Sequence, residues 1–277
     1  MGFRINTNVS SLSAQRSLGI NSRESESNLS KLSSGSRITK SADDAAGLAI
    51  SEKMKAGIRS MKQADRNAND GISMIQTAEG GLNEVSSILT RMRELAVQTS
   101  SDTVGDAERG MTNLEYQNLK LELERISQVT EFNGKKLLNG EGQKYDFQVG
   151  INNDDFQDRI SYEASQVNSR SENLGVDSLE VATKEGSQSS LASLDMAIEK
   201  VSGQRAFLGA IQNRLVSTSN NLQTTTENLS AANSRIRDLD YADATAQKAR
   251  NDILGAAGVS VLAQANMNGQ NALKLIG

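Results

Sequence analysis

The stretch that decides the fold runs from residue 57 to residue 98 and reads GIRSMKQADRNANDGISMIQTAEGGLNEVSSILTRMRELAVQ. Small and apolar residues recur in it every seven positions, in two rows offset by three or four residues, over more than five heptads. This spacing is typical of coiled-coil packing and predicts one long helix. The first row is Met61, Ala68, Ile75, Leu82, Leu89 and Ala96, and the second is Gly57, Ala64, Gly71, Ala78, Val85 and Met92.

A second heptad pattern lies toward the other end of the chain and predicts a second long helix. Its main row is Leu194, Val201, Leu208, Leu215, Leu222, Leu229 and Ile236. The companion row includes Gln204, Thr218 and Thr225, and polar residues in such a row lower stability but help to fix register. We expect the two rods to pack on each other inside one domain.

The segment between the rods predicts shorter elements. Residues 106–130 carry the apolar period of a third helix, and Asn133-Gly134 and Asn139-Gly140 mark turns. Alternating apolar residues on either side of a polar turn predict a small β-hairpin near 145–163. Residues 165–190 are rich in Ser, Glu, Asn and Gly, so we expect mostly loop there.

Composition excludes several classes of function. The chain has no Cys, Pro, Trp or His, so it lacks an imidazole base, a Cys or Ser-His nucleophile and a zinc cluster. The net charge of −4 comes from well-mixed acids and bases, which argues against nucleic acid, and the most apolar stretch, near 255–265, is about half the length that spans a membrane. We therefore predict a protein that is not an enzyme, with no cofactor, no metal, no nucleic-acid partner and no membrane insertion.

The junction after the first helix admits two interpretations. Gly35 is placed to end that helix, and Ser41 with Asp44 three residues later resembles a capping box that starts the next. A catalytic pair of Asp43 and Asp44 is the alternative. Capping is preferred because nothing else in the sequence singles the pair out.

Both ends of the chain carry apolar stripes with little to cover them. The first helix is thin in apolar residues, while the last is dense in them, and isolated helices of this kind are marginal in water. The simplest partner for such ends is another copy of the chain. The residues expected to join copies are Ile5, Val9, Leu12, Leu18, Ile253, Val261, Leu262, Leu273, Leu275 and Ile276.

Several linked motifs resemble those of bacterial flagellins. The resemblance covers about residues 1–150 and 190–277, in the family's order and spacing. It rests on Ile5-Asn6-Thr7-Asn8, Leu32-Ser33-Ser34-Gly35-Ser36-Arg37-Ile38, Asp43-Asp44-Ala45-Ala46-Gly47-Leu48-Ala49-Ile50, Arg93-Glu94-Leu95-Ala96-Val97-Gln98, Glu131-Phe132-Asn133-Gly134 and Val259-Ser260-Val261-Leu262-Ala263-Gln264-Ala265-Asn266.

The resemblance implies a mainly α fold, a long antiparallel coiled-coil-like bundle with a small β-hairpin. Residues 1–42 and 238–277 would pair as terminal helices in an inner, channel-lining domain, and 43–237 would form the helical rod domain. The stretch between the hairpin and the second rod is too short for the outer domains of many flagellins, which indicates a minimal form.

The resemblance also implies a function and partners. The chain would polymerise with copies of itself into the bacterial flagellar filament for swimming motility. It would be secreted to the extracellular flagellum, unfolded, by a type III export apparatus with an export chaperone, which agrees with an N-terminus that lacks a Sec-type signal. The filament cap and hook-associated proteins would be further partners. The alternatives are a hook–filament junction protein, or a secreted adhesin or effector that uses the same route.

In some flagellins an Arg, a Leu and a Glu are read by a host Toll-like receptor. The matching positions are Arg91, Leu95 and Glu115, and the same surface would also pack between subunits. Packing between subunits is the preferred explanation for these three residues.

Overall fold

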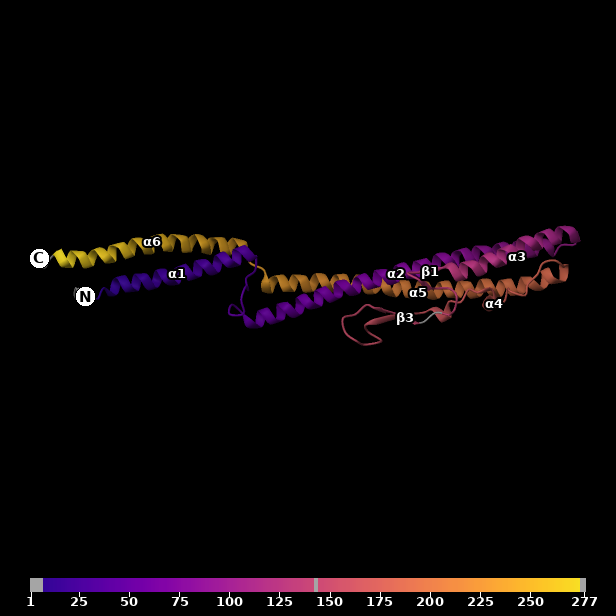
Figure 1. Cartoon of the computed structure of the whole chain (residues 1–277), viewed down its shortest axis with the longest axis horizontal. Coiled ribbons are helices and arrows are strands. Elements are labelled where there is room, and N and C mark those ends of the chain that lie inside the picture. Colours follow the sequence, from indigo (N-terminus) through magenta and orange to yellow (C-terminus); the bar gives the residue numbers. More distant parts are fainter. Residues whose placement is uncertain (1–6, 142–143, 275–277) are drawn as a thin grey trace. The chain divides into compact units, whose positions relative to one another are not determined.

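The computed structural model describes residues 7–141 and 144–274, with the backbone alone for 268–274. Long helices dominate, and the strands form two small antiparallel pairs (Figure 1). In chain order the elements are α1 (Val9–Ser34), α2 (Ala45–Thr99), α3 (Asp106–Val129), β1 (Glu131–Phe132), β2 (Lys135–Lys136), β3 (Lys144–Gln148), β4 (Arg159–Glu163), the 3-10 turn η1 (Ala164–Gln166), α4 (Ser171–Leu174), α5 (Lys184–Arg237) and α6 (Tyr241–Lys274).

The two predicted rods are present as α2 and α5, and they run antiparallel. The hydroxyl of Ser219 donates to Asp65 at 2.5 Å, while the guanidinium of Arg93 pairs with Asp195 at 2.6 Å. As residue numbers rise along α2 they therefore fall along α5. The heptad pattern was enough to predict both helices. Their antiparallel direction is established by the contacts between them.

Burial confirms the heptad rows. Most members of both rows are buried, while the last members of the second rod are half-buried. A core built this way needs few aromatic residues, because interdigitating Leu, Ile, Val and Ala fill the space between two helices. The fully buried members include Ala68, Ile75, Ala78, Leu82, Val85, Leu89, Met92, Ala96, Leu194, Ala197, Leu208 and Leu215.

The third helix and the hairpin also lie where the pattern predicted them. The strands β3 and β4 pair antiparallel, with Phe147 opposite Ile160, and Asn67 of α2 donates its side-chain amide to the carbonyl of Gln148 at 3.0 Å. Asn133 and Gly134 both have positive φ, as a two-residue turn between β1 and β2 requires. The contact with Asn67 packs the β3–β4 hairpin on α2.

The predicted capping box at Ser41 is wrong. Asp44 is the residue that caps α2: its side chain accepts from the amide of Gly47 at 2.8 Å. The Asp43 carboxylate accepts from the amide of Lys40 at 3.0 Å and closes the preceding turn. Both acids bind backbone amides, which leaves Ser41 outside the cap.

The predicted loop at 165–190 is wrong in its last part, because α5 already begins at Lys184. Ser187 and Ser190 are buried, and their hydroxyls donate to the carbonyls of Thr183 and Gly186 at 2.8 Å each. A serine that satisfies its hydroxyl on its own helix packs as a small residue. The serine-rich composition of this segment was interpreted as a sign of a loop. In the structure, Ser187 and Ser190 instead let the start of α5 pack closely against its neighbours.

The chain divides into two compact units, Met1–Ala56 with Asn228–Gly277, and Gly57–Glu227. The predicted limits, at about residues 42 and 238, lie at the turns between helices. The boundary found from contacts falls within α2 and within α5 instead. Both divisions place α1 and α6 in the same unit.

Two buried tyrosines differ in how their hydroxyls are satisfied. The Tyr162 hydroxyl donates to the carbonyl of Leu137 at 2.8 Å, and its pKa is raised by burial and by Tyr145. The Tyr116 hydroxyl is buried with no hydrogen-bond partner in the described chain, and burial raises its pKa to about 12. An unsatisfied buried hydroxyl costs stability, so the two side chains should respond oppositely to removal of their oxygen.

Tyr116→Phe is therefore expected to raise the free energy of unfolding by about 1 kcal/mol, and Tyr162→Phe to lower it by about the same amount. Urea unfolding of the monomer at pH 7 measures both. The raised pKa of Tyr116 adds a pH effect: the wild-type chain should lose stability above pH 10, as the unfolded tyrosine ionises, and Tyr116→Phe should lose less. Equal destabilisation by both substitutions would show that the hydroxyl of Tyr116 has a hydrogen-bond partner, as that of Tyr162 does.

Candidate functional site

The terminal helices α1 and α6 form an antiparallel pair (Figure 1). Asn8 caps α1 and donates its side-chain amide to the carbonyl of Ala265 at 2.8 Å. At the opposite end, the Tyr241 hydroxyl donates to the carbonyl of Leu32 at 2.9 Å. The pair is thus fixed in register at both ends by polar contacts.

Small and polar side chains form the face between α1 and α6. Ser11 and Asn251 are buried there, and Asn21 donates to the carbonyl of Asn251 at 2.8 Å. A Cβ at Gly258 would lie 3.2 Å from Leu18, so glycine lets the helices approach closely. The buried side chains described for the two helices are those of Ser11, Ala244, Asn251 and Ala265, which are all small or polar.

Many large apolar side chains of this pair are exposed to solvent, whereas Leu18, Leu32 and Leu262 are half-buried. Ile253 is 70% exposed. Exposed apolar surface on this scale marks an interaction site on a soluble protein. The other exposed members are Val9, Leu12, Ile20, Leu29, Tyr241, Leu254, Val259, Val261 and Met267.

The structure brings most of the predicted joining residues onto this pair. Val9, Leu12, Ile253 and Val261 are exposed, whereas Leu18 and Leu262 are half-buried. The side chain of Leu273, and the residues Ile5, Leu275 and Ile276, lie outside the described part of the chain.

The residues expected from the sequence to join copies did not include Ile20, Leu29, Leu254, Val259 or Met267, although all five are exposed. The available signal was that apolar residues surround α6 on all sides, so that one neighbouring helix cannot cover them. An expectation of one apolar face on each helix does not identify exposed apolar residues on the other faces.

The three residues that match a receptor-contact motif by position, and for which packing between subunits is the preferred explanation, do not all lie on the surface. Arg91 and Glu115 are exposed and form an ion pair at 2.9 Å between α2 and α3. Glu94 and Glu115 raise the pKa of Arg91, so it stays charged at any physiological pH. Leu95 is only 1% exposed and packs in the core of the rods, where a partner cannot touch it.

The catalytic reading of Asp43 and Asp44 finds no support in their surroundings. Hydrogen bonds from the amides of Lys40 and Thr39 hold the pKa of Asp43 below its ordinary value. Asp44 caps α2, and Asp43 closes the turn before it. Among the described residues no group of three or more Asp and Glu side chains could hold a metal ion.

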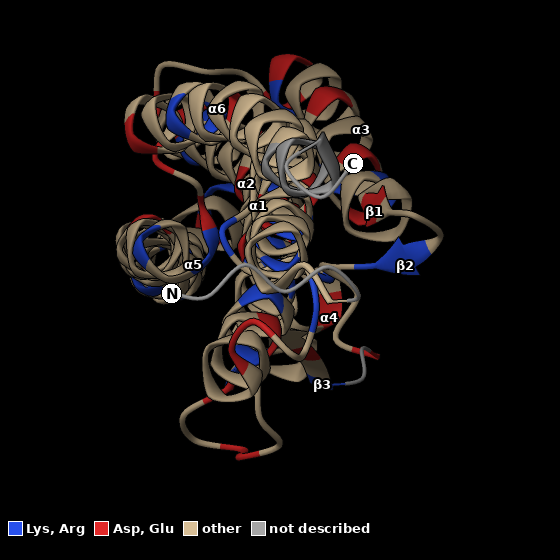
Figure 2. Cartoon of the chain, turned by 90° about the vertical axis from the view of Figure 1, so that its left-hand side faces the viewer, with Lys and Arg blue, Asp and Glu red and all other residues tan. Residues whose placement is uncertain are grey.

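Charge does not single out a face of the molecule. On the side seen in Figure 2, acidic and basic residues are interspersed along the helices. No described helix is long and apolar enough to cross a membrane. The exposed apolar residues of α1 and α6 are therefore the candidate site taken up below.

Comparison with known proteins identifies relatives along nearly the whole chain. The family model "Bacterial flagellin N-terminal helical region" matches residues 5–143, and "Bacterial flagellin C-terminal helical region" matches residues 191–276. A flagellin of Halalkalibacterium halodurans is 44% identical over 98% of this chain and 99% of its own length. The flagellar filament core protein flaB2 of Brachyspira hyodysenteriae is 38% identical over 98% of this chain and 99% of its own length.

The fold has a counterpart among solved structures. The crystal structure of Bacillus cereus flagellin matches with a TM-score of 0.51 and 29% sequence identity. The match covers 61% of this chain and 94% of that one. Over the matched part, this chain therefore shares its fold with a structurally characterised flagellin.

Proposed function

The chain belongs to the bacterial flagellin family and is a structural subunit of the flagellar filament, and from this premise we propose that α1 and α6 join one copy to the next. The observation that carries the proposal is the distribution of side chains on the helix pair, with small and polar residues between the helices and apolar residues on the outside. The inner face of the pair is small and polar, while residues such as Ile253 and Val261 face solvent. The hook–filament junction alternative is not favoured, because both family models and the full-length relatives are flagellins.

The energetics support assembly through these helices. Covering a Val, Leu or Ile side chain stabilises by about 1.5–3 kcal/mol, and the pair exposes several of them. A polar inner face contributes little to its own folding, so α1 and α6 gain most of their stability when neighbouring copies cover them. The terminal helices α1 and α6 would then become stably folded at the same time as the copy joins the filament.

The remaining partners follow from the family. We propose that the chain is exported by the type III apparatus with an export chaperone, and that it meets the filament cap and the hook-associated proteins. Its final location is the extracellular flagellum. The relatives are structural proteins, which agrees with a chain that performs no catalysis.

For recognition by a receptor, only Arg91 and Glu115 remain as candidate contacts, because Leu95 is buried. An exposed ion pair between Arg91 and Glu115 offers a charged contact to a host Toll-like receptor, and it equally suits packing between subunits. Leu95 contributes to the core under this pair. A substitution there would act through folding, so it cannot serve as a test of recognition.

Removal of the terminal segments tests the proposal. Deleting residues 1–40 or 240–277 is expected to abolish growth of filaments from seeds, as seen by electron microscopy, because the exposed apolar residues of α1 or α6 are lost. Residues 57–227 contain their own buried core, so the helical circular dichroism of the rods should persist. Normal polymerisation of either truncated chain would refute the proposal.

A further inference from the structure

All the sulfur of this protein is in methionine. The sequence has eight Met, and it has no Cys, His or Trp to react with an oxidant first. A thioether takes up one oxygen atom from a peroxide and becomes a sulfoxide, which turns an apolar side chain into a polar one. The methionines that solvent reaches are therefore the places where an oxidant changes the surface of the chain.

The structure divides the methionines by exposure. Met74 and Met92 are buried in the core of the rods, at 4% and 0% exposure. Met111 on α3, Met196 on α5 and Met267 on α6 are 72%, 56% and 54% exposed. Because the buried pair is shielded from peroxide, an oxidant modifies the exposed three first and leaves the core of the rods intact.

Met267 lies at the place where α6 is tied to α1. The carbonyl of Ala265 accepts from the side-chain amide of Asn8 at 2.8 Å, and the side chain of Asn266 accepts from the hydroxyl of Ser11 at 2.9 Å. These two residues of α6 directly precede Met267, so the backbone beneath its side chain is fixed. The thioether is thus presented to solvent from a fixed turn of the helix.

The same thioether continues the exposed apolar surface of α6. Val259 and Ala263 precede Met267 at intervals of four residues, and both are exposed. Residues four apart are neighbours on a helix surface, so the three side chains form one row. An oxygen atom added at Met267 therefore places a polar group within this apolar row.

We propose that Met267 is a redox-sensitive modification site that controls whether a free copy joins the filament. With the thioether intact, α6 presents an apolar surface and the copy joins. With the sulfoxide in its place, joining buries an S=O group that gives up its hydrogen bonds to water, which opposes assembly. The inference rests on the proposed joining role of α6 and adds a chemical control to it.

The modification needs a peroxide as its oxidant. A lone pair of the sulfur attacks one oxygen of hydrogen peroxide, so that the S–O bond forms and the O–O bond breaks. The leaving oxygen takes up the proton of the transferred one and departs as water. The sulfur loses two electrons and the peroxide gains them, so a methionine sulfoxide reductase with a thiol reductant reverses the change.

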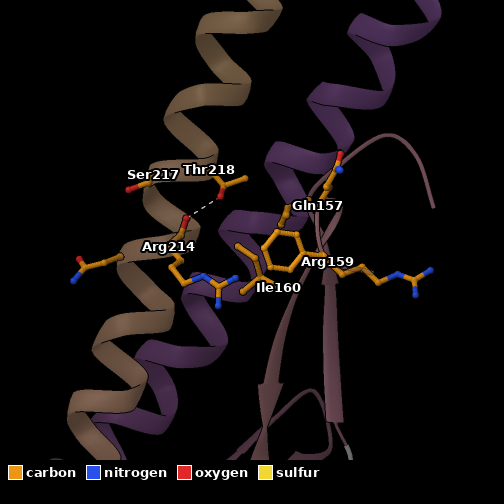
Figure 3. A pocket seen from close by; sticks show the side chains of 9 residues that line it. Gln157, Arg159, Ile160, Arg214, Ser217 and Thr218 are labelled. Atoms are coloured by element: carbon orange, nitrogen blue, oxygen red, sulfur yellow. Dashed lines mark hydrogen bonds between the residues drawn. The ribbon is translucent and has the colours of Figure 1, made fainter. Parts of the chain in front are cut away.

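Exposed apolar side chains that carry no sulfur take no part in this reaction. Phe156 is 90% exposed and lines the groove drawn in Figure 3, together with Ile160 and Arg214. A phenyl ring does not react with hydrogen peroxide under mild conditions. Peroxide treatment therefore changes the methionines and leaves the rest of the apolar surface as it was.

Oxidation of the monomer, with the peroxide then removed by catalase, tests the inference. Mass spectrometry of peptides measures the sulfoxide at each methionine, and sedimentation of seeded polymer measures the critical concentration. Full oxidation of Met267 should raise the critical concentration of the wild-type chain about tenfold or more. The helical circular dichroism should be retained, because Met74 and Met92 are buried.

Two single variants show which methionine is responsible. Met267→Leu keeps the apolar character and nearly the volume of the side chain, so peroxide should change its critical concentration by less than about twofold. Met196→Leu is the matched control, since Met196 is as exposed as Met267 but lies on α5, and it should respond as the wild type does. A Met267→Leu chain that responds to peroxide as strongly as the wild type would overturn the inference.

A further chain keeps the inference testable if Met267→Leu joins filaments poorly before treatment. In the double variant Met111→Leu/Met196→Leu, Met267 is the one that remains of the three exposed methionines. Peroxide should raise its critical concentration about tenfold or more, and methionine sulfoxide reductase should restore the original value. An unchanged critical concentration after oxidation would refute the redox control.

This failure differs from a failure of the joining role of α6. If oxidised copies join normally while deletion of residues 240–277 abolishes growth, α6 joins the copies and the redox control alone is wrong. If the deleted chain also polymerises, the premise on which the redox control rests is itself wrong.

Discussion

Ile253→Asp is expected to prevent filament growth while the monomer stays folded. Ile253 is 70% exposed on α6, so the substitution removes little contact within one copy. In the filament the change loses about 1.5–3 kcal/mol of apolar burial and adds the desolvation of a carboxylate, several kcal/mol more. The critical concentration for polymerisation should rise by about a thousandfold or more.

Sedimentation of seeded polymer over a range of monomer concentrations measures this effect. Met196→Asp provides the matched control, since Met196 is an exposed apolar residue of α5 outside the proposed contact. Its critical concentration should remain within about tenfold of the wild type. Equal losses for the two variants would mean that α6 has no special part in assembly.

Arg109→Met is expected to lower the free energy of unfolding by about 2–4 kcal/mol, because two backbone carbonyls lose their hydrogen-bond donor. The guanidinium is buried, and it donates to the carbonyls of Thr99 and Ser101 at 3.0 and 2.9 Å. It therefore caps the end of α2, whose last carbonyls have no partner in the helix. The Asp106 carboxylate that it also binds is exposed to solvent and adds little.

Denaturant unfolding of the monomer measures the loss, and Arg109→Lys should fail to recover it because an ammonium cannot span both carbonyls. Arg125→Ala is the control, because Arg125 pairs with Glu122 on the surface of the same helix. It should cost less than about 1 kcal/mol. A comparable loss at both positions would show that Arg109 is not a cap.

Much of this architecture could be predicted from the sequence. Heptad spacing predicted the rods, because a period of seven places residues such as Leu82 and Leu208 on one face whatever lies opposite. The hairpin and the helix end at Gly35 were predicted from turn chemistry, and Gly35 indeed adopts φ +67. Such features depend on neighbours within a few turns of chain.

Features that depend on distant contacts could not be predicted. Ser187 is helical and buried because Thr99, far away in sequence, donates to it at 2.8 Å. Leu95 matched a surface motif by position, yet the direction in which α2 turns its faces places it in the core. Phe156 directly follows the stretch interpreted as a polar turn, and only its 90% exposure singles it out.

The central claim is that neighbouring copies, and not the chain itself, stabilise α1 and α6. Amide hydrogen exchange in the monomer and in the filament tests it most directly. We predict fast exchange in the monomer across residues 9–34 and 241–267, slowed by about a hundredfold or more in the filament, while the buried amides of 57–227 are protected in both. Equal protection of the terminal helices in monomer and filament would contradict the account.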